Sequence, residues 1–303
     1  MFTLAYLTDP HLSPLPHPTL SQLLSKRLFG YINWNANRKA IHCRPVLDAL
    51  TADLLAQPFD HIAIGGDLIN LSLPGEFTNA LEWLQTLGAP EQVSVVPGNH
   101  DAYVPFDYAS GIGLWHDYMT SHAGKAKGLN RAGELFPYVR RFGKIALVGL
   151  RSGLPAPLLE ATGELGPAQR SALERNLIEL GKQEVYRIVM IHHPPLPGQS
   201  RPRRGLRDAG ELEEILTRNG AELVLYGHRH LQAVDYLETK SGPIPVVGTP
   251  SASSCQEEPG RLARYNLFRI WEARGRWHCE MTGRGLRAAG SPIIELEKTL
   301  LTE

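Results

Sequence analysis

The chain has 303 residues, and its 31 Lys and Arg residues equal its 31 Asp and Glu residues, so the formal net charge is zero. Proteins that grip the nucleic-acid backbone usually carry a basic excess, so we expect no nucleic-acid partner. Hydrophobic residues make up 43% of the chain and charged residues 20%, a globular composition able to bury a sizeable core. No run approaches the roughly 18 apolar residues of a membrane-spanning helix, so we predict no transmembrane segment.

The three cysteines, Cys43, Cys255 and Cys279, are odd in number and far apart in sequence. We therefore expect neither a disulfide framework nor a Cys-x-x-Cys metal site. A reducing compartment fits this cysteine usage best. The stretch from Met1 to Leu7 has no basic region and only a short apolar run, so no signal peptide is expected. The prediction is a cytoplasmic protein.

Short apolar runs alternate with amphipathic stretches along the first third of the chain. Runs at 3–7, 61–64 and 92–96 predict buried strands, and stretches at 44–55 and 75–87 predict helices. This alternation favours α/β layers around a mixed sheet. Each of the three strands is followed closely by polar residues.

Residues 12–43 interrupt this alternation and are expected to form a surface insertion. After a proline-rich loop comes a stripe of apolar residues spaced as one face of a helix: Leu20, Leu23, Leu24, Leu28 and Phe29. We expect this stripe to pack on a small core of its own. The alternative is a lid that meets a lipid or an apolar substrate, which leaves peripheral membrane contact open.

The remaining chain continues the alternation after a second surface insertion, expected at 102–134. Residues 136–150 contain two strand-like runs around Phe142 and Gly143, a pattern typical of a hairpin. Further helices are expected at 168–180 and 208–218, and further strands at 185–191, 223–226, 246–247, 264–271 and 276–281.

No internal repeat or low-complexity linker divides the chain. We therefore predict a single domain over residues 1–285 that carries the two surface insertions, rather than two domains. A C-terminal tail follows over 286–303, and residues 292–303 within it are expected to form a short helix.

Five polar clusters stand out from the apolar runs. They are Asp9-Pro10-His11, Gly66-Asp67-Leu68-Ile69-Asn70, Gly98-Asn99-His100-Asp101, His192-His193 and Gly227-His228-Arg229-His230. Each follows a short, mostly apolar run, as if at the carboxyl end of a strand. Because ligand sites in α/β sheets gather at those ends, we expect clusters distant in sequence to converge at one edge.

The donor groups in these clusters are carboxylate, carboxamide and imidazole, with no thiolate. Such a set suits Mn, Fe, Zn or Co. The predicted metal ligands are Asp9, His11, Asp67, Asn99, His192, His228 and His230. One ion takes about four to six ligands, so seven candidates favour two divalent cations about 3.5–4 Å apart that share one carboxylate. Such a pair clamps the attacking and leaving oxygens of an in-line displacement at phosphorus.

Each cluster taken alone has an ordinary explanation. Gly66 and Asp67 are turn residues in their own right, and His192 and His193 before two prolines could be a packed pair at a strand end. Five such coincidences in one order are improbable, which favours the metal centre. We expect His193 to support the fold or the neighbouring ligands, or to contact substrate. Arg151, directly after a predicted strand, is a further candidate substrate contact.

The motifs D-x-H, G-D-x-x-N, G-N-H-D, H-H and G-H-x-H, in this order, resemble those of the calcineurin-like metallophosphoesterases. The resemblance covers about residues 3–255. It implies a four-layer α/β/β/α sandwich with mixed sheets. It also implies one metal held by Asp9, His11, Asp67 and His230, and a second held by Asp67, Asn99, His192 and His228. Asp67 would then bridge the two ions.

The resemblance also implies roles for two residues that are not ligands. His100 matches the family histidine that contacts phosphate and stabilises or protonates the leaving group. Asp101 stands where the family has an acidic residue that orients this histidine. Asn70, in the second motif, is not expected to be a ligand.

The implied activity is hydrolysis of a small phosphate ester by a metal-bridging hydroxide. The surrounding residues resemble most the bacterial cyclic-nucleotide and glycerophosphodiester phosphodiesterases, so phosphodiester hydrolysis is the first hypothesis. The alternative is a pyrophosphohydrolase or phosphomonoesterase. The stretch from Lys26 to Tyr31 resembles calcineurin-like enzymes that act on UDP-diacylglucosamine, a nucleotide-sugar lipid. A catalytically silent interaction module is disfavoured, because every ligand position is filled.

Overall fold

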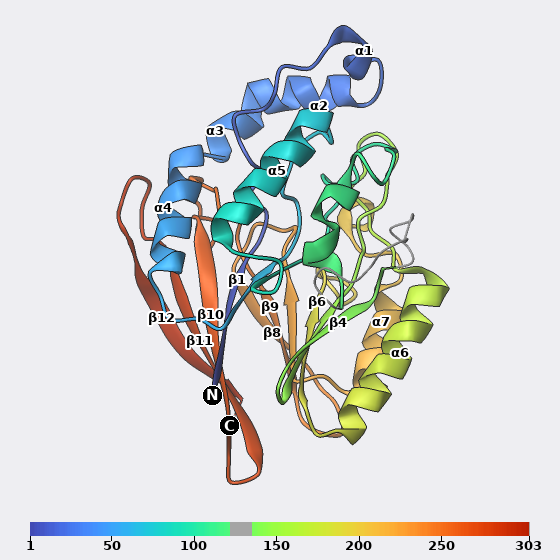
Figure 1. Ribbon diagram of the computed structural model, residues 1–303, viewed down its shortest axis with the longest axis vertical. Coiled ribbons are helices and arrows are strands. Elements are labelled where there is room, and N and C mark those ends of the chain that lie inside the picture. Colours follow the sequence, from blue (N-terminus) through green and yellow to red (C-terminus); the bar gives the residue numbers. More distant parts are fainter. Residues whose placement is uncertain (122–134, 303) are drawn as a thin grey trace.

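The computed structural model describes residues 1–121 and 135–302 and contains two six-stranded sheets packed face to face (Figure 1). The first sheet has the order β12 (Ile293–Thr302), β11 (Arg276–Leu286), β10 (Arg264–Ala273), β1 (Phe2–Leu7), β2 (His61–Ile64) and β3 (Val93–Val95). The second has the order β4 (Tyr138–Phe142), β5 (Ile145–Gly149), β6 (Tyr186–Met190), β7 (Leu223–Tyr226), β9 (Ile244–Gly248) and β8 (Ala233–Leu237).

Both sheets are mixed, as expected. In the first, β1, β2 and β3 run parallel, whereas β10 pairs antiparallel with β1 and continues into the antiparallel ribbon of β11 and β12. In the second, β5, β6, β7 and β9 run parallel, and the edge strands β4 and β8 are antiparallel to their neighbours. The parallel strands of the two sheets end at a common edge.

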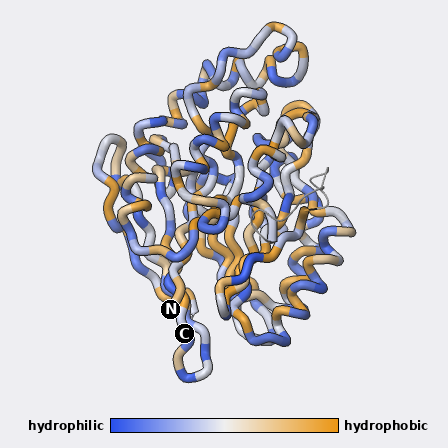
Figure 2. Tube along the Cα trace, in the orientation of Figure 1, coloured by the Kyte–Doolittle hydropathy of each residue, from blue (hydrophilic) through white to orange (hydrophobic). Residues whose placement is uncertain are grey.

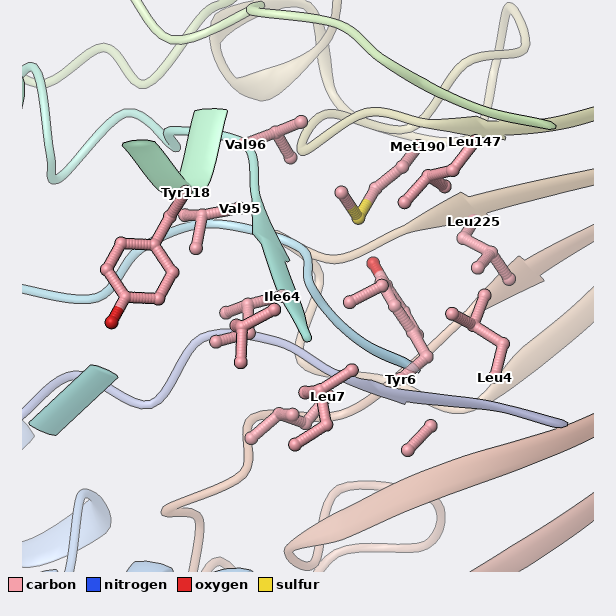
Figure 3. Close-up of a cluster of buried hydrophobic side chains, with 14 of the residues drawn as sticks. Leu4, Tyr6, Leu7, Ile64, Val95, Val96, Tyr118, Leu147, Met190 and Leu225 are labelled. Carbon is pink, nitrogen blue, oxygen red and sulfur yellow. The ribbon is translucent and has the colours of Figure 1, made fainter. Parts of the chain in front are cut away.

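The core between the sheets explains why the central strands are apolar along their whole length. Leu147, Met190 and Leu225 of the second sheet lie opposite Leu4 and Tyr6 of the first, and all are buried (Figure 3). The intervening side chains of the second sheet point the other way, into a separate core beneath helices. Strands buried on both faces lose the polar alternation of an exposed sheet, and hydrophobic residues accordingly gather along them (Figure 2).

Helices cover the outer faces of both sheets. They are α4 (Arg44–Leu55) and α5 (Pro74–Leu87) on the first sheet, and α6 (Gly166–Lys182) and α7 (Ala209–Asn219) on the second. Leu173 and Leu177 of α6 and Leu212 of α7 pack against Val148 and Val189 of the second sheet. The result is the helix–sheet–sheet–helix layering that the sequence predicts.

The first insertion forms a helical arm at one end of the molecule (Figure 1). It comprises α1 (Leu20–Leu23), α2 (Arg27–Asn33), a π-helical turn (Trp34–Arg38) and α3 (Lys39–Ile41). The expectation that its leucines pack on a core of their own is wrong, because Leu20 is 85% and Leu24 87% exposed. Instead α2 turns Arg27 toward the body of the protein, where it donates to the carbonyls of Leu71 and Ser72.

The C-terminal segment corrects two further expectations. The short helix expected over 292–303 is replaced over Ile293–Thr302 by β12, which pairs antiparallel with β11 and buries Leu301. The expected division into a domain over 1–285 and a tail over 286–303 does not separate β12 from the first sheet. The short edge strand β8 was not expected from the sequence.

In the second insertion, Ile112–Met119 form a 3-10 helix, and residues 122–134 lie outside the described part of the chain.

The cysteines depart from the expectation of free thiols, because Cys43 and Cys255 form a disulfide across 212 residues of sequence. The neighbouring residues His42 and Ser254 form an antiparallel bridge, which places the two thiols side by side. Cys279 is buried and free. The expected cytoplasmic location stays a prediction.

Across residues 1–121 and 135–302, no helix has the length and apolar character needed to cross a bilayer.

The packing between the sheets predicts a large cost for removing a central side chain. Leu147→Ala should lower the free energy of unfolding by about 2–5 kcal/mol, because it removes buried methyl groups and leaves a cavity. Urea unfolding of the metal-free protein measures this, and Leu24→Ala at an exposed site is the matched control. Equal stability of the two variants would contradict a shared core between the sheets.

Candidate metal centre

The predicted ligands all lie in loops that follow five parallel strands. Those after β1, β2 and β3 come from the first sheet, and those after β6 and β7 from the second. Because the sheets pack face to face, these loops meet at the common edge. Two groups of potential ligand atoms, each within 4.8 Å of one another, form there: Asp9 with His11 and Asp67, and Asp67 with His192 and His228.

The first group joins the loops after β1, β2 and β7. The Nε2 atom of His230 lies 3.1 Å from Oδ1 of Asp9. The Nε2 atom of His11 lies 3.3 Å from Nε2 of His230 and 3.8 Å from Oδ2 of Asp67. Four donor atoms from three separate loops therefore face one small volume.

The second group joins the loops after β2, β3, β6 and β7. The Nε2 atom of His192 lies 3.4 Å from Oδ2 of Asp67 and 3.2 Å from Oδ1 of Asn99. The Nδ1 atom of His228 lies 3.2 Å from Nε2 of His192. The same oxygen of Asp67 thus faces both groups, which is the arrangement expected of a carboxylate shared between two cations.

The histidine rings are held in tautomers that leave a lone pair toward these groups. Nδ1 of His11 donates to the carbonyl of Ile69, and Nδ1 of His192 donates to that of Gly65. His228 is held the other way round, with Nε2 bonded to the carbonyl of Arg204 at 2.8 Å. Backbone acceptors of this kind fix ring orientation and raise the basicity of metal-binding histidines.

The backbone of the ligand loops is strained. In the described part of the chain, nine residues other than glycine have positive φ, and five of them are predicted ligands: Asp9 (52°), His11 (41°), Asp67 (52°), His228 (66°) and His230 (49°). Such conformations cost of order 1–3 kcal/mol each and gather at functional sites. At Gly66, where φ is 99°, an added Cβ would lie 2.8 Å from Nδ1 of His192, so only glycine fits there.

The electrostatics of the site fit two bound cations. Burial alone would raise the pKa of Asp67, but His192 and His100 lower it well below its usual value. Burial lowers the pKa of His228 to about 3, which leaves its imidazole neutral and able to bind metal. Burial opposes a charge on His192, but Asp67 and Asp9 raise its pKa to about 9, so a cation would compete with that proton. Ionised, buried carboxylates need compensating positive charge.

His100 lies beside this centre, and the expected role of Asp101 in orienting it stays a prediction. The amide of His100 donates to Oδ1 of Asp67, and its ring Nδ1 donates to the carbonyl of Asn70 at 2.6 Å. The Asp101 carboxylate instead accepts from the amides of Gly98 and Ile69. Asp101 therefore holds the loop that carries His100 and does not touch its ring.

The two candidate substrate contacts lie in different settings. His193 is fully buried, and its ring is paired with the Ser152 hydroxyl and the Ala161 carbonyl, so it supports the fold and is not free to contact substrate. The amide of Arg151 donates to Oε1 of Gln169, and Nε2 of Gln169 donates to the carbonyl of Arg151. The role of Arg151 toward substrate stays a prediction.

Sequence reasoning missed two residues of the site, both in the helical arm. His42 has a ring nitrogen within 4.8 Å of those of His11 and His230. Arg38 donates from Nη1 to Nε2 of His100 at 2.9 Å and from Nη2 to Nε2 of His11 at 3.1 Å. Neither belongs to a motif or follows a strand, so no sequence pattern marked them.

The shared carboxylate predicts the metal content of a variant. Asp67→Asn keeps the side-chain volume and removes the negative charge, so bound manganese should fall from about two ions per chain to one or none. Elemental analysis after dialysis measures this, with the surface variant Asp48→Asn as the control. Full metal content in Asp67→Asn would show that this carboxylate is not shared.

Comparisons with known proteins identify the family and the fold. Residues 2–232 match the model of the calcineurin-like phosphoesterase family. A solved dimetal phosphatase from Danio rerio has the same fold, at 13% identity and a TM-score of 0.64 over 99% of this chain and 98% of that one. A 5'-nucleotidase precursor from Thermus thermophilus is 15% identical over 92% of this chain and 54% of that one, with a TM-score of 0.46. No curated protein matches the chain. The chain belongs to the calcineurin-like phosphoesterase family and is a metal-dependent phosphoester hydrolase.

Proposed function

We propose that this protein hydrolyses phosphodiesters of small molecules. The observation that carries the proposal is the position of His100, whose amide bonds to Asp67 and whose ring centroid lies 5.0 Å from that of His11. A diester leaves as an alkoxide, which is a poor leaving group and gains most from a positioned donor. We expect His100, which lies beside both ligand groups, to give that help.

Manganese, iron, zinc or cobalt ions suit the donor set. One would be held by Asp9, His11, Asp67 and His230, and the other by Asp67, Asn99, His192 and His228. When bound, two such ions supply Lewis acidity at the phosphoryl oxygens and lower the pKa of water. The chain itself supplies rigid positioning, since the ligand rings are bonded to backbone carbonyls.

The second candidate is a pyrophosphohydrolase or phosphomonoesterase, with a nucleotide-sugar lipid as one substrate. The helical arm favours it, because α2 points Leu28, Phe29 and Ile32 outward with 43%, 55% and 56% of their surface exposed. An outward apolar face beside a phosphate site would suit the acyl tail of a substrate, or peripheral contact with a bilayer. Zero net charge continues to disfavour a nucleic-acid substrate.

A hydrolysis panel separates these candidates. The manganese-loaded protein would be assayed with bis-(p-nitrophenyl) phosphate, a cyclic nucleotide, a glycerophosphodiester, a nucleotide-sugar lipid and a phosphomonoester. We expect cleavage of the diesters and complete loss of activity after chelation. Cleavage of monoesters alone, or of the nucleotide-sugar lipid alone, would establish the second candidate. Absence of turnover with both metals bound would establish a silent module.

The role given to His100 predicts a dependence on the leaving group. His100→Asn should lower kcat about 10²–10⁴-fold for a diester with an alkoxide leaving group, and less for one that releases p-nitrophenolate. Metal content should stay unchanged. The control is His278→Asn on β11, which lies away from the edge where the ligand loops meet. An equal loss for both leaving groups would argue that His100 does not assist departure.

A further inference from the structure

The helical arm delivers one cationic side chain into the metal centre. Arg38 is the last residue of the π-helical turn Trp34–Arg38. Its two terminal nitrogens reach different histidines, with Nη1 2.9 Å from Nε2 of His100 and Nη2 3.1 Å from Nε2 of His11. The guanidinium therefore lies between a metal ligand and the histidine proposed to assist the leaving group.

These contacts leave the guanidinium incompletely satisfied. Its Nε atom is buried without a hydrogen-bond partner. Within the described ranges 1–121 and 135–302, no carboxylate lies within ion-pair distance of Arg38, whereas Arg170 and Arg187 each pair with one. Imidazoles offer one lone pair each, whereas a guanidinium carries five N–H donors in a rigid fork. A partly buried cation of this kind is suited to a multidentate anion.

The charge of the loaded site calls for the same partner. Two divalent cations outweigh the carboxylates of Asp9 and Asp67, and Arg38 adds to this positive excess. The guanidinium fork matches two oxygens of a phosphoryl group in geometry and charge. The two histidines accept only some of the hydrogen bonds that Arg38 can donate. The phosphoryl oxygens of an anionic phosphate ester held by the metals would accept the others.

The arm is anchored in a way that fixes Arg38. Trp34 is 5% exposed and stacks on His42 with an interplanar angle of 3°. Beyond the π-helical turn, the disulfide between Cys43 and Cys255 ties the end of the arm to the loop after β9. Turns of π-helix occur often at functional sites, since they redirect a side chain that a regular α-helix would place elsewhere. Preorganised donors of this kind bind without the cost of ordering.

We propose that Arg38 is a phosphate-binding residue, which the arm supplies to hold the non-bridging oxygens of the substrate's phosphoryl group. This inference rests on the proposed function in one respect, that a phosphate ester occupies the centre. It does not depend on whether that ester is a diester, a pyrophosphate or a monoester, because each presents non-bridging phosphoryl oxygens.

Binding of inorganic phosphate to the manganese-loaded protein tests this without turnover. Arg38→Met should weaken phosphate binding about 10- to 100-fold, as expected for the loss of charge-assisted hydrogen bonds, and should raise KM for bis-(p-nitrophenyl) phosphate. Arg38→Lys keeps the charge without the fork and should give an intermediate affinity. Lys39→Met, at the exposed neighbouring position, is the matched control and should bind phosphate as the wild type does. Calorimetry and elemental analysis measure affinity and metal content together.

Two results would overturn the inference. One is an Arg38→Met variant that binds phosphate and substrate as the wild type does, even if its thermal stability falls. The other is loss of bound manganese in that variant, which would assign Arg38 to the cations. If the wild type cleaves no diester yet binds phosphate through Arg38, the inference holds and the proposed diester substrate is wrong.

Discussion

The Asp67 carboxylate is the group on which the centre depends, because it joins ligands carried by the two sheets. Its Oδ2 atom lies 3.8 Å from Nε2 of His11, from the first sheet, and 3.4 Å from Nε2 of His192, from the second. Its Oδ1 atom accepts the amide of His100. A buried charge in this position is costly unless cations compensate it. The fold brings the ligands to this carboxylate, the histidine tautomers leave lone pairs for cations, and the proposed chemistry uses those cations.

The same requirement explains where the molecule accepts local strain. The ligand loops hold Asp9, Asp67 and His228 at positive φ, a conformation that costs stability in these residue types. Hydrogen bonds between loops offset that cost, such as those from the amide of Asp9 to the carbonyl of Gly66 and from the amide of His11 to that of Asp67. The apolar cores on both faces of the second sheet then supply the rigidity that keeps these loops in place.

The sequence predicted the layers and the ligands because both follow local rules. Apolar runs marked the buried strands, and polar residues directly after them marked the sheet edge, where Asn99 and His192 lie together beside Asp67. Arg38 and His42 were missed, since their positions depend on the path of a helical arm that no periodicity encodes. The disulfide between Cys43 and Cys255 was missed for the same reason, because only the folded chain brings them together. The C-terminal strand was mistaken for a helix, because pairing with β11 overrides local preference.

The most direct measurement of the central claim is the anomalous X-ray scattering of crystals grown from manganese-loaded protein. The account predicts two peaks, about 3.5–4 Å apart, on either side of the Asp67 carboxylate. One should lie against Asp9, His11 and His230, and the other against Asn99, His192 and His228. A single peak, or ions bound away from Asp67, would contradict a shared two-cation centre.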